Sequence, residues 1–110
     1  MPARKTVKSS KIVNLRKLAQ GKQCMIRLPG CNHNPETTVL AHYRLSGYTG
    51  MGMKPDNFAM GAWSCSACHD LVDGRVQSEH DRLALRLAHS EGCLRTMAEV
   101  RQMKARGELD

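Results

Sequence analysis

Two pairs of cysteines constrain the fold of this 110-residue chain more than any other feature of its sequence. Cys65 and Cys68 are three positions apart, so one helical turn or a tight knuckle can direct both sulfurs to a single ion. The upstream pair, Cys24 and Cys31, completes the four thiolates that tetrahedral zinc prefers. We therefore predict a structural zinc ion bound by these four cysteines.

The cysteines also allow other interpretations. Cysteine is commonly buried without binding anything, and the fifth cysteine, Cys93, could replace one of the assigned ligands. The segment Cys65–His69 matches the Cys-x-x-Cys-His pattern of covalent haem attachment. Haem leaves Cys24 and Cys31 unexplained, however, and two closely spaced pairs in so short a chain favour zinc.

The composition indicates a single small domain with a thin core. Aromatic residues make up only 4% of the chain, and a small core with few large rings often needs a metal or disulfides for stability. No apolar run is long enough to cross a bilayer, and the basic N-terminus lacks the apolar segment of a secretory signal. These features favour the cytoplasm and no membrane partner, and clustered cysteines in that compartment usually hold metal.

The net charge of +7 is concentrated at the N-terminus. Residues 1–22 contain seven lysines and arginines and no acidic residue, whereas the other ten basic residues are balanced by ten acidic ones. Such a segment can bind a phosphate backbone without reading bases, and a solubilising tail is the alternative. The candidate nucleic-acid contacts are Arg4, Lys5, Lys8, Lys11, Arg16 and Lys17.

The pattern of apolar residues and turn residues predicts a small α+β fold. We expect a disordered basic arm over residues 1–9 and one domain over residues 10–110, with its core at 22–75 and C-terminal helices within 79–107. In chain order the predicted elements are a helix from Ser9 or Ser10 to about residue 20, a knuckle at 24–31, strands at 37–43 and 58–63 around a glycine-rich loop at 46–56, a helix at 65–74, and two helices that Gly92 separates. A knuckle, a hairpin and a helix in this order are the treble-clef way of enclosing zinc.

Two histidines and an aspartate are candidates for a second site. His42 is expected at the end of the first strand, where a neutral imidazole can take a proton from water. His69 and Asp73 are four positions apart on a predicted helix, so they share one face and could bind a divalent ion together. A partly buried histidine and a helix-surface hydrogen bond are the alternatives for these residues.

Three short motifs together resemble the HNH (ββα-metal, His-Me finger) family of endonucleases: Ala41-His42, Asn57-Phe58 and Cys65–His69. Three further segments look more specifically like the small phage and prophage nucleases of the YbcO type: Cys24–Gly30, Asn34–Thr37 and Lys54-Pro55. The similarity covers residues 15–73, and it is weak for the basic arm and the last two helices.

The resemblance implies a role for each matching residue. His42 would be the general base, Asn57 would fix the geometry of the loop, and His69 would bind a catalytic Mg²⁺ or Mn²⁺ ion. Asp73 falls where the family often supplies a further metal ligand. Many relatives carry Asp or His immediately before the base, whereas this chain has Ala41, so one expected ligand is missing.

The sequence therefore predicts a zinc-stabilised, HNH-like endonuclease that hydrolyses DNA phosphodiester bonds in phage or prophage recombination or DNA processing, inside a bacterial host. DNA is the expected partner, and a recombination protein is a further candidate. The alternative is a non-catalytic zinc module that binds nucleic acid or a recombination partner. Ala41 is the residue that supports this alternative.

Overall fold

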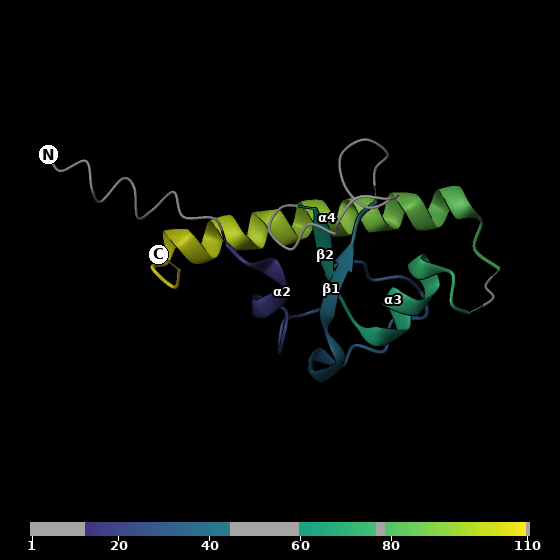
Figure 1. The fold of residues 1–110 in the computed structure, drawn as a ribbon, viewed down its shortest axis with the longest axis horizontal. Helices are drawn as coiled ribbons and strands as arrows, with labels where there is room; N and C mark the ends of the chain where they lie inside the picture. The colour runs from purple at the N-terminus through teal and green to yellow at the C-terminus, as the bar shows by residue number, and fades with distance from the viewer. Residues whose placement is uncertain (1–12, 45–59, 77–78, 110) are drawn as a thin grey trace, which may run out of the picture.

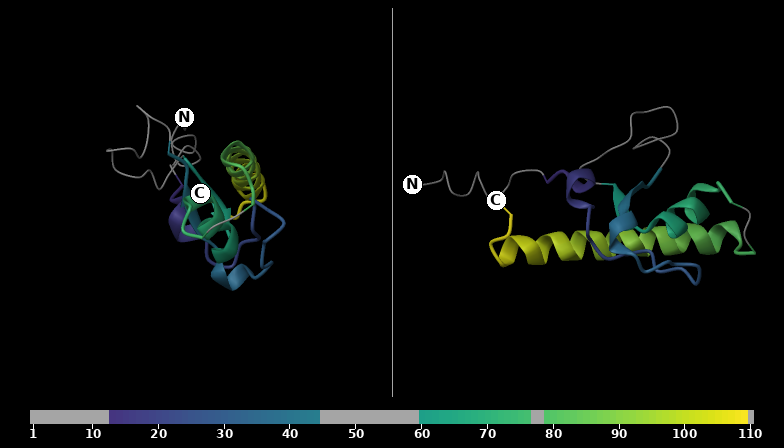
Figure 2. Two further views of the ribbon diagram at one scale, coloured as in Figure 1. Left: turned by 90° about the vertical axis from the view of Figure 1, so that its right-hand side faces the viewer. Right: turned by 90° about the horizontal axis from the view of Figure 1, so that it is seen from below.

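The computed structural model describes residues 13–44, 60–76 and 79–109, and these ranges form a small α+β fold (Figure 1). The two shorter helices flank a two-stranded sheet, one on each side, and the long C-terminal helix runs along all three (Figures 1 and 2). The elements in chain order are α2 (Leu15–Leu18), the 3-10 helix η1 (Pro35–Thr37), β1 (Val39–His42), β2 (Gly61–Ser64), α3 (Ser66–Asp73) and α4 (Arg82–Ala105).

The hairpin of β1 and β2 separates the core into two clusters. The strands are antiparallel, with Leu40 opposite Trp63 and Ala41 opposite Ala62. Since side chains alternate between the faces of a strand, these two pairs point in opposite directions. Ala41 and Ala62 pack in a cluster that includes the cysteines, whereas Leu40 and Trp63 pack against residues of α2 and of the C-terminal half of α4.

Trp63 connects the three layers of the fold. Its side chain is fully buried, and its indole N–H donates to the carbonyl oxygen of Leu15 at 2.9 Å. Its backbone N–H donates to Thr96 Oγ1 in α4, and its carbonyl oxygen accepts from the backbone N–H of Met25. A single residue of β2 therefore fixes α2, α4 and the segment that contains the first cysteine.

The structure corrects the predicted start of the first helix. Asn14, in an extended conformation, caps α2 through a side-chain oxygen that accepts from the backbone N–H groups of Arg16 and Lys17. A continuous helix from Ser9 or Ser10 to about residue 20 is therefore wrong, because the chain at Asn14 is extended, and residues 9–12 lie outside the described residues. Asparagine is one of the best N-cap residues, since its oxygen bonds the otherwise unsatisfied N–H groups of the first turn.

The strands are also shorter than predicted. Thr37 belongs to η1 rather than to the first strand, and β2 begins at Gly61. Residues 58 and 59, like the predicted loop at 46–56 and the arm at 1–9, lie outside the described residues. The predicted helix at 65–74 is confirmed as α3, which Cys65 caps at its start and Gly74 ends in the left-handed conformation at φ 77°.

The two predicted C-terminal helices are one continuous helix, α4. Gly92 does not end a segment; it lies buried in the helix where α4 crosses the knuckle and β2. A Cβ atom at this position would lie 2.8 Å from Ile26 Cγ1 and 3.1 Å from Ala62 Cβ. The glycine therefore permits close packing of α4 on the sheet. The outward face of α4 carries Leu83, Leu87 and Leu94, which are exposed even though Leu83 and Leu87 recur at helical spacing.

We expect Gly92→Ala to destabilise the protein. Overpacking costs about 1–3 kcal/mol, and a contact of 2.8 Å to Ile26 Cγ1 places this site in the upper part of that range, above the gain of about 1 kcal/mol in helix propensity. The melting temperature should fall by at least about 4 °C. Gln102→Ala, at an exposed position of the same helix, is the matched control and should leave the melting temperature unchanged or slightly raised. An unchanged or higher value for Gly92→Ala would contradict the packing account.

Candidate functional site

The four cysteines of the two pairs converge on one point. The Sγ atoms of Cys24, Cys31, Cys65 and Cys68 all lie within 4.8 Å of one another, and those of Cys31 and Cys65 are 3.7 Å apart. Four sulfurs at about 2.3 Å from a central zinc would be separated by about 3.8 Å along each edge of a tetrahedron. The donor set and its spacing therefore fit a metal ion, and they are consistent with zinc.

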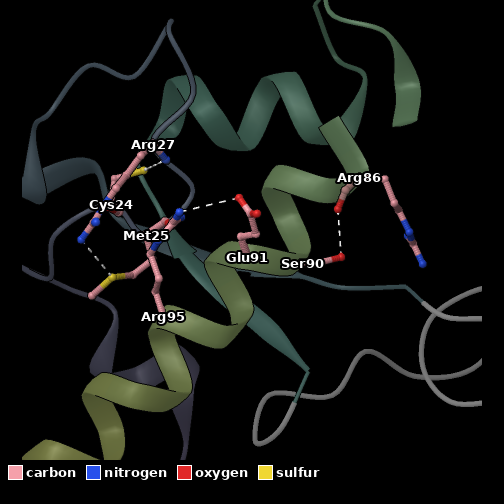
Figure 3. Close-up of polar contacts among 7 residues, drawn as sticks. All are labelled: Cys24, Met25, Arg27, Arg86, Ser90, Glu91 and Arg95. Carbon is pink, nitrogen blue, oxygen red and sulfur yellow. Dashed lines mark hydrogen bonds and ion pairs between the residues drawn. The ribbon is translucent and has the colours of Figure 1, made fainter. Parts of the chain in front are cut away.

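Backbone N–H groups point at three of the four sulfurs. Cys24 Sγ accepts from the N–H of Arg27, Cys31 Sγ from that of His33, and Cys65 Sγ from that of Cys68, at 3.4–3.5 Å. Arg27 and His33 both have a positive φ, which lets the chain turn back toward the sulfur that each one faces. Figure 3 shows the Arg27 contacts, including the bond from its backbone to Cys24. These bonds favour the thiolate form that a metal requires.

The pKa values of the buried cysteines respond to this crowding. A hydrogen bond from Cys68 lowers the pKa of the Cys24 thiol, and the same contact, together with burial, raises the pKa of Cys68. Burial also raises the pKa of Cys31. One thiolate is thus favoured and further ones are disfavoured in the absence of a cation. A divalent metal supplies the positive charge that lets the remaining thiols ionise.

Cys93 lies outside this cluster. It packs from α4 against the core around the four cysteines, and burial raises the pKa of its thiol to about 11. In the described part of the chain it is therefore a partly buried apolar residue that lies outside the four-cysteine cluster. Cys65 and Cys68, the pair that the haem pattern would use, both belong to the four-cysteine cluster.

A cleft of about 560 Å³ between α2, β1 and α3 brings the second set of candidate residues together. His42 lines it from the end of β1, and His69 and Asp73 line it from successive turns of α3. The side-chain cap of Cys65 and the backbone bond from His69 N–H to the Cys65 carbonyl fix the start of α3. The residues that hold the four-cysteine cluster in place therefore also set the direction in which His69 and Asp73 project.

The alternation of β1 explains why Ala41 is absent from the cleft. Leu40 and His42 are on the face that lines the cleft, and Ala41 is buried on the opposite face among the core residues around the cysteines. A longer side chain at position 41 would therefore point toward α4 in this fold.

The walls of the cleft are basic. Four cationic side chains line it: Arg16, Lys17, Arg44 and Arg75. Arg16 and Lys17 are candidate contacts from the sequence, whereas Arg44 and Arg75 carry no signal in the sequence beyond their charge. Arg75 Nε lies 3.1 Å from Asp73 Oδ2 in an ion pair whose arginine is largely exposed. Exposed pairs contribute at most about 1 kcal/mol, so Asp73 can exchange this partner for a metal ion.

The remaining candidates cannot be placed. Asn57 and the arm residues Arg4, Lys5, Lys8 and Lys11 lie outside the described residues. Within the described ranges, each helix is too short or too polar to cross a bilayer.

A family model and two relatives among known proteins carry the same family name. A family model described as "Putative nuclease YbcO" matches residues 13–105. Two relatives are 52% identical over 66 residues, which is 59% of this chain and 68% of each relative: "Putative nuclease YbcO" of Escherichia coli (strain K12) and "Putative nuclease ybcO" of Enterobacteria phage 82. The chain is also similar to a solved structure, "Structure of a putative bacteriophage protein from Escherichia coli str. K-12 substr. MG1655". The two sequences are 37% identical and the TM-score is 0.68, over 82% of this chain and 99% of that one.

We expect the purified protein to contain about one zinc and no iron, because a closed four-thiolate site suits zinc. Cys68→Ser should lose the metal and unfold, since metal binding contributes on the order of 10 kcal/mol in small zinc modules. Cys93→Ser is the matched control and should keep both zinc and fold. Elemental analysis and circular dichroism give the readouts. A folded, metal-free Cys68→Ser protein would contradict the assignment.

Proposed function

The chain belongs to the family described as "Putative nuclease YbcO", and from this premise we propose that it is a metal-dependent endonuclease of the HNH type that hydrolyses DNA phosphodiester bonds. In this proposal the four cysteines hold a structural zinc ion in a treble-clef, ββα-metal core. The names of the relatives support a role on nucleic acid, and their occurrence in a phage and a bacterium supports a role in phage or prophage DNA processing.

The observation that carries the proposal is the meeting of His42, His69 and Asp73 in one basic cleft. These residues come from two elements that are separated in the chain, and they share the cleft with four cationic side chains. A proton acceptor, a pair of possible metal ligands and several cations are the groups that phosphodiester hydrolysis needs. The cleft is also open enough for a nucleic-acid backbone to enter.

His42 acts as the general base. Its neutral imidazole takes a proton from a water molecule, and the resulting hydroxide attacks phosphorus opposite the leaving oxygen. His42 is half-buried at the end of a paired strand, so the backbone on which it stands is held in place before substrate arrives. Such positioning lowers the entropic cost of reaching the reactive geometry.

His69 and Asp73 are the residues that would hold a Mg²⁺ or Mn²⁺ ion. The Asp73 carboxylate is the kind of ligand these ions prefer, the His69 imidazole is a better ligand for transition metals than for Mg²⁺, and other positions remain for water and phosphate. When bound, such an ion stabilises negative charge on the phosphate and on the leaving oxygen. The four thiolates have no open position around their own ion, and their role is structural.

The cationic residues of the cleft bind the sugar–phosphate backbone. Arg16 and Lys17 project from α2, whose position Trp63 fixes through its bond to Leu15, and Arg75 follows α3. Contacts of this kind position the substrate and do not read its sequence. The N-terminal arm would extend the same backbone contacts.

A non-catalytic module that binds nucleic acid or a recombination protein is the second candidate. The specific observation that favours it is Ala41, which stands where many HNH enzymes carry a metal ligand and is buried against the core. With only His69 and Asp73 as ligands, a divalent ion would be held weakly. A DNA cleavage assay separates the two candidates.

We expect the protein to nick supercoiled plasmid in Mg²⁺ or Mn²⁺, and His42→Ala to lower the rate by at least about 100-fold, the usual contribution of a general base. Asp73→Asn should also lose activity. Asp70→Asn is its matched control, because this carboxylate is on the same helix but does not line the cleft. Equal rates for the parent and His42→Ala would refute the catalytic role, and DNA binding without cleavage in either metal would favour the second candidate.

A second experiment tests the basic wall. Each phosphate contact adds about 0.9 to the slope of log binding constant against log salt concentration for duplex DNA. The double variant Arg16→Gln, Lys17→Gln should therefore bind more weakly and lower the slope by about 2. Arg101→Gln, Lys104→Gln, which removes the same charge from α4 outside the cleft, should leave the slope nearly unchanged. Equal slopes for both double variants would mean that the cleft is not where DNA binds.

A further inference from the structure

His89 is a buried histidine that neither the zinc cluster nor the cleft uses. It lies in the N-terminal half of α4, with 7% of its surface exposed. Its Nε2 atom is 2.9 Å from the carbonyl oxygen of Ala41. A carbonyl oxygen only accepts, so Nε2 carries the proton and donates it. Burial lowers the pKa of His89, which favours this neutral, donating form.

The residue after His42 is held by the same turn of α4. The Tyr43 ring meets His89 edge-on, with ring centres 5.0 Å apart, and its hydroxyl lies 2.6 Å from Ser90 Oγ. Ser90 donates its own proton to the carbonyl oxygen of Arg86, a bond drawn in Figure 3. The Tyr43 hydroxyl must therefore be the donor to Ser90.

Arg86 completes this set of contacts. Its guanidinium carbon lies 4.0 Å from the centre of the Tyr43 ring, a cation–π contact. One of its amino groups donates to the carbonyl oxygen of Arg44 at 2.6 Å. A single turn of α4 thus contacts the chain immediately before and immediately after His42, while His42 itself lines the cleft from the other face of β1.

We propose that His89 is a positioning residue for His42: its bond to the Ala41 carbonyl, supported by the Tyr43–Ser90 and Arg86 contacts, sets the backbone from which the His42 imidazole projects into the cleft. The proposal rests on the proposed function, in which His42 is the base. The pair of His42 with Gly61 and the bond from the Tyr43 N–H to the Met60 carbonyl oxygen hold this part of β1 from the side of β2, and the contacts from α4 hold its neighbours from a second direction. A displacement of about 1 Å at a reacting group can lower a rate by about 100-fold.

The test compares His89→Leu, which removes the donor, with His89→Gln, whose side-chain amide can donate in its place. A cavity of about 60 Å³ beside His89 gives the new side chains room. For His89→Leu we expect kcat for plasmid nicking to fall roughly 10- to 100-fold with KM little changed, and the NMR signals of the His42 ring to shift. His89→Gln should recover most of both. Leu94→Ala, on the exposed face of α4, is the control and should match the parent.

Other outcomes decide against the proposal. Parent-like kcat and parent-like His42 signals in His89→Leu would overturn it, and so would equal losses in His89→Leu and His89→Gln. If His89→Leu does not fold, Ser90→Ala, which removes the acceptor of the Tyr43 hydroxyl together with the bond to the Arg86 carbonyl oxygen, should still shift the His42 signals, and unchanged signals would count against the proposal. If the parent itself cuts no DNA, the proposed function fails, and the His42 signals alone then decide the positioning role.

Discussion

The close approach of four cysteine sulfurs is the constraint on which the rest of the structure depends. Cys24 and Cys31 belong to a loop without regular structure, and Cys65 and Cys68 belong to the junction of β2 and α3. Few large apolar side chains are available to join these segments, since Trp63 is the only tryptophan and aromatic residues are scarce. A metal ion shared by four thiolates can supply that cohesion, because its binding energy becomes folding energy.

The metal cluster and the cleft are linked through α3. Cys65 is at once a sulfur of the cluster and the cap of this helix, and His69 and Asp73 follow it on the first and second turns. The four-cysteine cluster thereby sets the orientation of α3. The position of His42 is set by the pairing of β1 with β2 and by the contacts from α4. In the proposed function, chemistry at the cleft needs none of the four cysteines to take part, so a closed metal site and an open reactive site could share one small fold.

The parts of the fold that the sequence predicts well are those with a local signal. The cysteine spacing, the turn at Pro29-Gly30, where Cys31 N–H donates to the Leu28 carbonyl, and the glycine that ends α3 at residue 74 all depend on near neighbours. The placement of His69 and Asp73 on one helix face follows from helical periodicity. Their meeting with His42 needs the hairpin register, which the resemblance to a known family supplies and periodicity does not.

The errors arise where a distant contact decides a local feature. Glycine often ends a helix, but at position 92 the lack of a side chain instead allows α4 to pack closely against Ile26 and Ala62. Leu83 and Leu87 have the spacing of a core face, yet Leu85 and His89 occupy the core. His89 gives no sign in the sequence of its bond to a residue 48 positions earlier. No local pattern contains this information.

The most direct test of the four-thiolate site is X-ray absorption spectroscopy at the zinc edge of the purified parent protein. The account predicts four sulfur neighbours at about 2.3 Å and no nitrogen or oxygen in the first shell. Fewer than four sulfurs, or a nitrogen or oxygen ligand in place of one, would contradict this prediction. The metal would then not join Cys24 and Cys31 to the start of α3 through all four thiolates, and the position of α3 beside the cleft would need another explanation.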